Sequence, residues 1–168
     1  MLLFTPGPTP VPESVRQAMA TPTIHHRTPE FEAIFAQARE KMMDMFKMDE
    51  CIFLASSGTG AMQACMVNLC QKKALTINSG KFGERFGKIA DALNLPKVEL
   101  KYDWNTPVSI DDVKKALDEN SDIDAICIQI CESAGGLRHP VEEVAALAKS
   151  INKDIMVIAD GITAVGVE

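Results

Sequence analysis

The chain has 168 residues, of which 46% are hydrophobic and 24% are charged, and its formal net charge is −6. This composition is typical of a globular domain with a sizeable core. The acidic balance and the absence of a Lys/Arg stripe argue against nucleic acid as a main partner. No apolar run is long enough to span a bilayer, and the first twelve residues do not have the pattern of a signal peptide. We therefore expect a cytoplasmic protein that binds neither a membrane nor nucleic acid.

The cysteines predict no metal or redox site. There are five of them, an odd number, and none form a C-x-x-C pair: Cys51, Cys65, Cys70, Cys127 and Cys131. This spacing matches neither a zinc site nor a thioredoxin-like motif. Cys51 and Cys127 lie in apolar runs, where a free cysteine behaves as a small hydrophobe. We expect no metal.

Residues 1–28 are predicted to form an N-terminal arm, and residues 29–168 a single domain. The segment Thr5–Pro12 contains four prolines, which remove hydrogen-bond donors and favour an extended chain. Helical periodicity begins at Pro29 and runs to Lys47, with Thr28 as the N-cap. The apolar face of this helix, rich in methionine and phenylalanine, is expected to pack in the core.

Short apolar runs then alternate with helical patterns. We expect strands at 51–55, 74–78, 98–102, 125–130 and 155–159, and helices opening near 58, 82, 113 and 141. Strands that are apolar on both faces and alternate with helices indicate an α/β fold, with a mostly parallel sheet and helices on both faces. Ligands of such sheets bind beyond the carboxyl ends of the strands, so the residues there are the candidates for chemistry.

The loop after the first expected strand, Ser56–Gly60 (SSGTG), opens directly into a helix. Glycines let a ligand approach the backbone, and a helix N-terminus offers free N–H groups to an anion. A dinucleotide fingerprint is excluded because its third glycine position is Gln63, and no G-K-[ST] tripeptide is present for a P-loop. The loop predicts a phosphate or carboxylate site, with a simple glycine-bearing turn as the alternative.

Three further polar or aromatic side chains follow the later strands. Phe82 lies between glycines and could lie flat against a planar ligand. Ser133 could hydrogen-bond a phenolic oxygen. Asp160 ends an apolar strand, where a carboxylate is costly unless a cation pairs with it. Alone, each has a purely structural alternative: a buried helix start for Phe82, a turn for Ser133 and a cap of the next turn for Asp160.

Together the four loops match the needs of pyridoxal 5′-phosphate. The phosphate needs an anchor, the ring a stacking partner and the phenolic oxygen a donor. The pyridine nitrogen needs a carboxylate that keeps it protonated, so that the ring can act as an electron sink.

At this point the sequence resembles the class V, fold type I aminotransferases, and within them the alanine–glyoxylate and serine–pyruvate group. The resemblance covers nearly the whole chain, and its motifs occur in the family's order. They are PGPTPVP at 6–12, HHRTPEF at 25–31, SGTGA at 57–61, NSGKFG at 78–83, ESAGG at 132–136 and ADG at 159–161.

The resemblance implies a role for each of these segments. The segment from Ser57 through Gly58 and Thr59 to Gly60 would hold the cofactor phosphate. Phe82 would stack on the ring, where relatives often carry tryptophan, and Ser133 would contact the phenolic oxygen. Asp160 would pair with the pyridine nitrogen as the catalytic carboxylate. The arm around Gly7 would lie near the substrate at a homodimer interface.

The same resemblance places His26 and Arg27 near the substrate, although a surface or interface role is equally compatible with these residues. It also implies that residues 29–168 are part of the cofactor-binding large domain. The family's Schiff-base lysine lies downstream of the strand-end aspartate, and no lysine follows Asp160 here. The family's smaller C-terminal domain is also expected to be missing. We therefore expect the N-terminal portion of an enzyme, inactive by itself.

The function implied is transfer of an amino group between a small amino acid, of the alanine or serine type, and an oxo acid, of the glyoxylate or pyruvate type. One alternative is a cysteine desulfurase-like lyase, although such enzymes typically have histidine at the position of Phe82. The other is an inactive fragment that serves only in assembly.

Overall fold

The computed structural model describes residues 2–5 and 7–167. Its backbone contacts divide the chain into two compact units, Met1–Phe53 and Leu54–Glu168, each of which is described by itself. The boundary expected at 28/29 falls inside the first unit, and the division into arm and domain stays a prediction. Pro6, in the predicted extended segment, lies outside the described residues. The other residues of that segment form neither helix nor strand, as expected.

The first unit contains two helices, α1 (Glu13–Met19) and α2 (Pro29–Phe46). Helix α2 begins as predicted, with the Phe31 N–H donating to Thr28 Oγ1 at 3.4 Å. It ends at Lys47, whose φ of 53° is left-handed. Helix α1 was not predicted; it begins directly after Pro12, its N-cap residue, where a missing N–H does no harm.

The apolar face of α2 is not buried among the described residues, so the expected core packing of this face is wrong for this structure. Ile34 is 60% exposed and Met45 is 62% exposed. The exposed side chains of this face have no sheet of their own unit to pack against. A helical repeat of apolar residues shows which face of the helix is hydrophobic, but not whether the same chain buries that face.

The strand expected at 51–55 is also wrong. The structure assigns no strand there, and Ile52 is 82% exposed. The Cys51 carbonyl accepts a hydrogen bond from Arg39 Nε at 3.2 Å, and Glu50 pairs with the same guanidinium. The backbone is therefore tied to α2 instead of a neighbouring strand.

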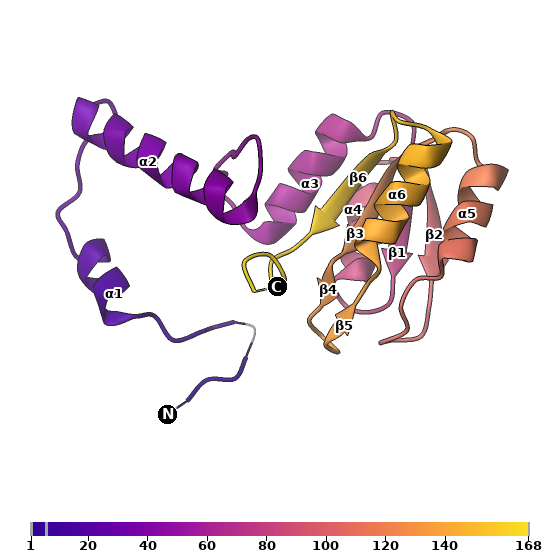
Figure 1. The fold of residues 1–168 in the computed structure, drawn as a ribbon, viewed down its shortest axis with the longest axis horizontal. Coiled ribbons are helices and arrows are strands. Elements are labelled where there is room, and N and C mark those ends of the chain that lie inside the picture. Colours follow the sequence, from indigo (N-terminus) through magenta and orange to yellow (C-terminus); the bar gives the residue numbers. More distant parts are fainter. Residues whose placement is uncertain (1, 6, 168) are drawn as a thin grey trace. The chain divides into compact units, whose positions relative to one another are not determined.

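The second unit is built on a four-stranded sheet (Figure 1). Its strands are β1 (Lys73–Asn78), β2 (Lys97–Lys101), β3 (Ile123–Gln129) and β6 (Met156–Asp160). Their order is β2-β1-β3-β6, and every neighbouring pair is parallel. The predicted parallel sheet is confirmed. Because Gln129 is opposite Asp160 in the register, β3 and β6 end at the same edge.

Helices cover both faces of this sheet, as predicted. Helices α3 (Gly58–Leu69) and α4 (Gly83–Ala92) lie on one face, and α5 (Ile110–Glu119) and α6 (Val141–Ile151) on the other (Figure 1). Neighbouring strand residues face opposite sides. Ala125 therefore packs with α3 and α4, whereas Ile126 packs with α5 and α6.

Two short strands, β4 (Cys131–Glu132) and β5 (Leu137–Arg138), form an antiparallel hairpin just beyond β3. This hairpin was not predicted, and its turn carries Ser133. Helix α5 is capped at its start, since Ser109 Oγ accepts from the Asp112 N–H at 3.4 Å. Within the described part of the chain, no helix combines the length and the apolar character needed to cross a lipid bilayer.

Candidate functional site

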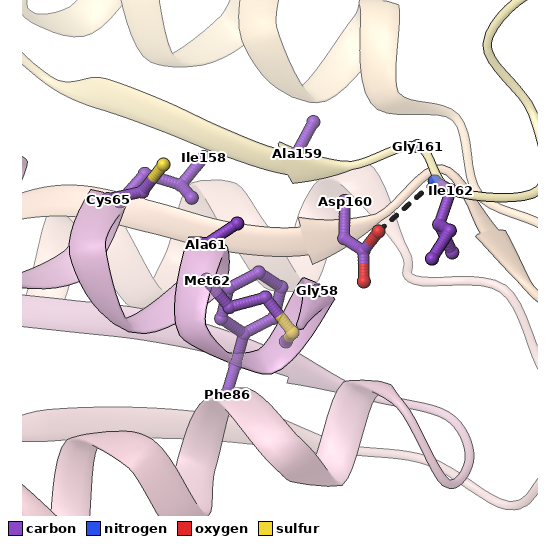
Figure 2. A pocket seen from close by; sticks show the side chains of 10 residues that line it. All are labelled: Gly58, Ala61, Met62, Cys65, Phe86, Ile158, Ala159, Asp160, Gly161 and Ile162. Carbon is purple, nitrogen blue, oxygen red and sulfur yellow. Dashed lines mark hydrogen bonds between the residues drawn. The ribbon is translucent and has the colours of Figure 1, made fainter. Parts of the chain in front are cut away.

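A pocket of about 240 Å³ opens between α3 and the end of β6 (Figure 2). Gly58, at the start of α3, and Asp160, at the end of β6, both line it. The remaining wall is mostly apolar, with contributions from Ala61, Met62, Cys65, Phe86, Ile158, Ala159, Gly161 and Ile162. Two residues that are about a hundred positions apart in the sequence, and were predicted to share a ligand, thus lie in one cavity.

The N-terminus of α3 has amide groups that the helix does not use. The first helical bond at this end runs from the Ala61 N–H to the Ser57 carbonyl at 3.1 Å. The amides before Ala61 have no partner one turn back. Ser57 is in the N-cap position with extended backbone, but its side chain makes no capping hydrogen bond. The positive end of the helix therefore remains available to an anion.

Gly60 is required by the close approach of a serine. A Cβ at Gly60 would lie 2.0 Å from Ser56 Oγ, so any side chain there would force Ser56 to move. At Gly58, by contrast, a Cβ would be at an ordinary 3.6 Å from Ile162 Cδ1. The Ser56 hydroxyl thus lies against the first turn of α3, in the space that a side chain at position 60 would need.

The Asp160 carboxylate has one hydrogen-bond partner. Its Oδ1 accepts from the Ile162 N–H at 3.1 Å, which caps the turn after β6 (Figure 2). This is the structural role given above as the alternative for Asp160. No further partner of the side chain is found in residues 2–5 and 7–167, so Oδ2 can still accept from a ligand. Asp160 is half-buried, and the capping bond and a cation at Oδ2 are compatible.

Phe82 is held through its backbone by two buried side chains. Its N–H donates to Glu132 Oε2 at 2.9 Å, and its carbonyl accepts from Gln129 Nε2 at 3.0 Å. Glu132 Oε2 also accepts from the Gly83 N–H at 2.8 Å. Glu132 and Gln129 are each 1% exposed. Glu132 lies in β4, just beyond the end of β3, and from there it caps the start of α4.

Gly80 makes room for this carboxylate. A Cβ at Gly80 would lie 2.6 Å from Glu132 Cγ. The glycine before Phe82 therefore has a packing reason, independent of any ligand.

Arg85 connects the start of α3 with Phe82. Its Nη1 donates to Thr59 Oγ1 at 3.0 Å, and its Cζ lies over the Phe82 ring, 4.9 Å from the centroid. Sequence reasoning missed Arg85. Its spacing from Phe82 signals only the contact with that ring, because residues three apart on a helix lie on the same face. The bond to Thr59, in another helix, has no local signal in the sequence.

The other predicted site residues do not line this pocket. Ser133 is half-buried in the turn between β4 and β5, and neither Ser133 nor Phe82 is part of the pocket wall. Gly7, His26 and Arg27 are exposed in the Met1–Phe53 unit. The Arg27 N–H donates to His25 Nδ1 at 3.1 Å, and the His25 and His26 rings stack with centroids 4.6 Å apart.

The acidic, histidine and cysteine side chains do not gather into a metal site. Throughout the described ranges, no group of three or more is placed to hold an ion. All five cysteines are free thiols. The amide groups of α3 and the Asp160 carboxylate instead suit a ligand with an anionic group and a cationic ring nitrogen, which are features of pyridoxal phosphate.

Comparisons with known proteins agree with this geometry. A family model described as "Aminotransferase class-V" matches residues 1–168. An uncharacterized aminotransferase of Helicobacter pylori strain J99 is 53% identical over 100% of this chain and 46% of its own length. A serine–glyoxylate aminotransferase of Hyphomicrobium methylovorum is 31% identical over 98% of this chain and 42% of its own.

The solved structure of an aspartate aminotransferase of subgroup IV from Thermus thermophilus superposes on this chain with a TM-score of 0.90. It is 30% identical, and the match covers 98% of this chain and 47% of that one. The chain thus spans about half the length of the curated relatives it matches.

Proposed function

We propose, from the premise that this chain belongs to the class V aminotransferase family, that it forms the cofactor-binding part of a pyridoxal-phosphate aminotransferase. The observation that carries the proposal is the pocket shared by Gly58 and Asp160. One wall offers uncapped helix amides for a phosphate, and the other offers a carboxylate with a free oxygen for a ring nitrogen.

The proposed roles follow the order of the strand ends. The amides of Gly58, Thr59 and Gly60, with Ser57 beside them, bind the phosphate group. Phe82 gives the ring an aromatic face, and Ser133 donates to the phenolic oxygen. When bound, the cofactor supplies an electron sink for the bonds around the substrate's α-carbon.

Asp160 has the catalytic role in this proposal. Its carboxylate holds the proton on the ring nitrogen, because a cation and an anion stabilise one another in a partly desolvated pocket. The apolar wall that includes Met62, Phe86 and Ile158 excludes water from this pair and strengthens their attraction.

The substrates we propose are a small amino acid of the alanine or serine type and an oxo acid of the glyoxylate or pyruvate type. The name of the Hyphomicrobium relative supports this pair. Gly7, His26 and Arg27 are proposed to lie near the substrate. A homodimer and a cytoplasmic location belong to the same proposal.

The test uses the protein expressed from its complete gene and purified with pyridoxal phosphate. Asp160→Ala is expected to lower transaminase turnover by about 100-fold or more, the usual effect of removing a charge that acts on the reacting group. Thermal unfolding of the variant should change little, because Asp160 makes one exposed capping bond. Turnover would be measured with alanine or serine and with glyoxylate or pyruvate.

Asp154→Ala is the matched control, because Asp154 is an exposed carboxylate in the turn just before β6. It should leave turnover unchanged. Near-normal turnover in Asp160→Ala would remove the proposed role of Asp160. Formation of alanine from cysteine, with sulfide released when a reducing thiol is added, would show the lyase in place of amino transfer.

A further inference from the structure

Arg85 is a half-buried cation without a carboxylate partner. No acidic oxygen lies within ion-pair distance of its guanidinium in the described ranges 2–5 and 7–167. Two other half-buried cations have such partners: Lys97 pairs with Asp91 at 2.7 Å, and Lys73 pairs with Asp122 at 2.8 Å. The contacts of Arg85 are instead the Thr59 hydroxyl and the Phe82 ring.

The position of this charge is electrostatically unfavourable without a ligand. Thr59 is in the first turn of α3, where the helix dipole is positive. A guanidinium that donates to Thr59 brings a second positive charge to that end. Both potentials attract the same counter-ion, an anion at the start of α3.

The hydrogen bond also sets the direction of the Thr59 hydroxyl. A hydroxyl has one hydrogen to donate and two lone pairs that accept. Because Arg85 Nη1 occupies a lone pair at 3.0 Å, the hydroxyl hydrogen must point elsewhere and is available to an acceptor. Arg85 thereby makes Thr59 a donor at the site where the first amides of α3 are also free.

The Arg85 guanidinium also contacts the Phe82 ring. The guanidinium carbon is 4.9 Å from the ring centroid, within the range of a favourable cation–π contact. Phe82 is fixed in turn by the buried side chains of Glu132 and Gln129. The arginine is therefore placed by the fold before any ligand binds.

We propose that Arg85 is a positioning residue for the phosphate group of the ligand. It acts through the Thr59 hydroxyl and makes the site select a phosphorylated ligand over its phosphate-free form. This inference rests on the proposed function, since it assigns a determinant of affinity to the same site.

The test compares the affinities for pyridoxal phosphate and for pyridoxal, which lacks the phosphate, by titration of the purified protein expressed from its complete gene. Arg85→Gln is expected to weaken the binding of pyridoxal phosphate roughly 10- to 100-fold, the range for the loss of a hydrogen bond that involves a charged group. It should change pyridoxal affinity less than about 3-fold, because that ligand has no group at α3.

A cycle with Thr59→Val tests whether Arg85 acts through the hydroxyl. In the Thr59→Val background, Arg85→Gln should lower the affinity for pyridoxal phosphate less than about 3-fold, since the hydroxyl that Arg85 orients is already gone. The matched control is Lys88→Gln, because Lys88 is on the same helix but is exposed and paired with Glu84 at 2.8 Å. That control should bind both ligands as the wild type does.

Equal weakening of pyridoxal and pyridoxal phosphate would overturn the inference, as would full additivity with Thr59→Val. Should Arg85→Gln not fold, Arg85→Lys replaces it: lysine keeps the charge but loses the planar fork, and a selective loss of roughly 3- to 10-fold is expected. No selective loss in that variant would likewise overturn the inference. If the wild type binds neither ligand, the proposed function fails first and the inference fails with it.

Discussion

Helices α3 and α4 both begin beyond the carboxyl ends of the parallel strands, but their first amide groups are treated differently. At α4, the N–H groups of Phe82 and Gly83 donate to the buried carboxylate of Glu132. At α3, the N-cap residue Ser57 makes no side-chain hydrogen bond, and Gly58, the first residue of the helix, lines a pocket. Among the described residues, the fold thus supplies an anion to the start of α4 and none to the start of α3.

The capped start of α4 contributes to stability, whereas the uncapped start of α3 is suited to binding a ligand. A helix start that is capped by a buried carboxylate gains stability and cannot bind a second anion there. A helix start that is left open is less stable by that amount, and it can bind a phosphate or carboxylate from outside. The two helix starts differ in how many backbone N–H groups lack an acceptor from the protein's own side chains. At α3, a ligand can supply that acceptor.

The largest effect is expected when the α4 cap is removed. Glu132→Ala leaves the amides of Phe82, Gly83 and Ala134 without their carboxylate acceptor. Unsatisfied buried donors are costly, so the free energy of unfolding should fall by on the order of 3 kcal/mol or more. Chemical denaturation of the apo protein measures this loss.

Glu119→Ala is the control for Glu132→Ala, because the Glu119 side chain is 62% exposed and its pairing with Lys115 is a surface contact. Its effect should stay within about 0.5 kcal/mol. If Glu132→Ala were equally mild, the amides at the start of α4 would have to find water or another acceptor. The contrast between the two helix starts would then disappear.

At the amino end of the sheet, the carboxylate of Asp124 also accepts hydrogen bonds from several groups of the protein itself. Asp124 accepts from the Gln71 N–H at 2.9 Å, the Lys73 N–H at 3.2 Å and the Cys70 thiol at 3.2 Å. Burial raises the pKa of Cys70 to about 12, so its thiol remains a donor at neutral pH. Burial acts to raise the pKa of Asp124, but these hydrogen bonds outweigh it and the pKa is lowered.

Asp124→Asn should lower the free energy of unfolding by about 1–3 kcal/mol at neutral pH, since hydrogen bonds to a charged acceptor are lost. The folded-state pKa of Asp124 lies below its ordinary value. Its contribution is therefore present above the unfolded-state pKa, which is about 4, and is lost as the pH falls through the folded-state pKa. Denaturation curves of both proteins should converge on acidification; a gap that is constant with pH would contradict this.

The sequence predicted the strands of the sheet well where they were marked by continuous apolar runs. Apolar runs such as Ala125–Ile128 predicted buried parallel strands, and the ends of such strands must meet at one edge. This argument placed Asp160 at the carboxyl edge of the sheet. It placed Gly58 there only through a strand at 51–55 that the structure lacks. The run at 51–55 looked the same in sequence but forms no strand, because its backbone is bonded to Arg39.

The supporting residues could not be predicted in the same way. Glu132 reaches the amides of Phe82 and Gly83 about fifty positions away, and Arg85 reaches Thr59 twenty-six positions away. Such partners depend on which strand lies beside which, and on the direction of each helix. Residue type and local spacing do not contain this information, so the sequence indicated the groups that a ligand needs and missed those that hold them.

The smallest effect in this comparison is expected from two serines in the same N-cap position. Ser109 Oγ accepts from the Asp112 N–H and caps α5, whereas Ser57 caps nothing at α3. Ser109→Ala should therefore lower the free energy of unfolding by about 0.5–2 kcal/mol, the usual cost of a lost serine cap. Ser57→Ala should change it by less than about 0.5 kcal/mol, as measured by denaturation of the ligand-free protein.

The same two variants respond differently to ligand. With pyridoxal phosphate bound, the stabilisation of each protein depends on its affinity for the ligand. Ser109→Ala should gain as much stability as the wild type does, because Ser109 belongs to α5 on the opposite face of the sheet. Ser57→Ala should gain less, because it has lost a hydroxyl beside the open amides. Equal losses for both serines in the ligand-free protein would mean that Ser57 caps α3 in solution, and α3 would then no longer differ from α5 or α4 in having an unsatisfied start.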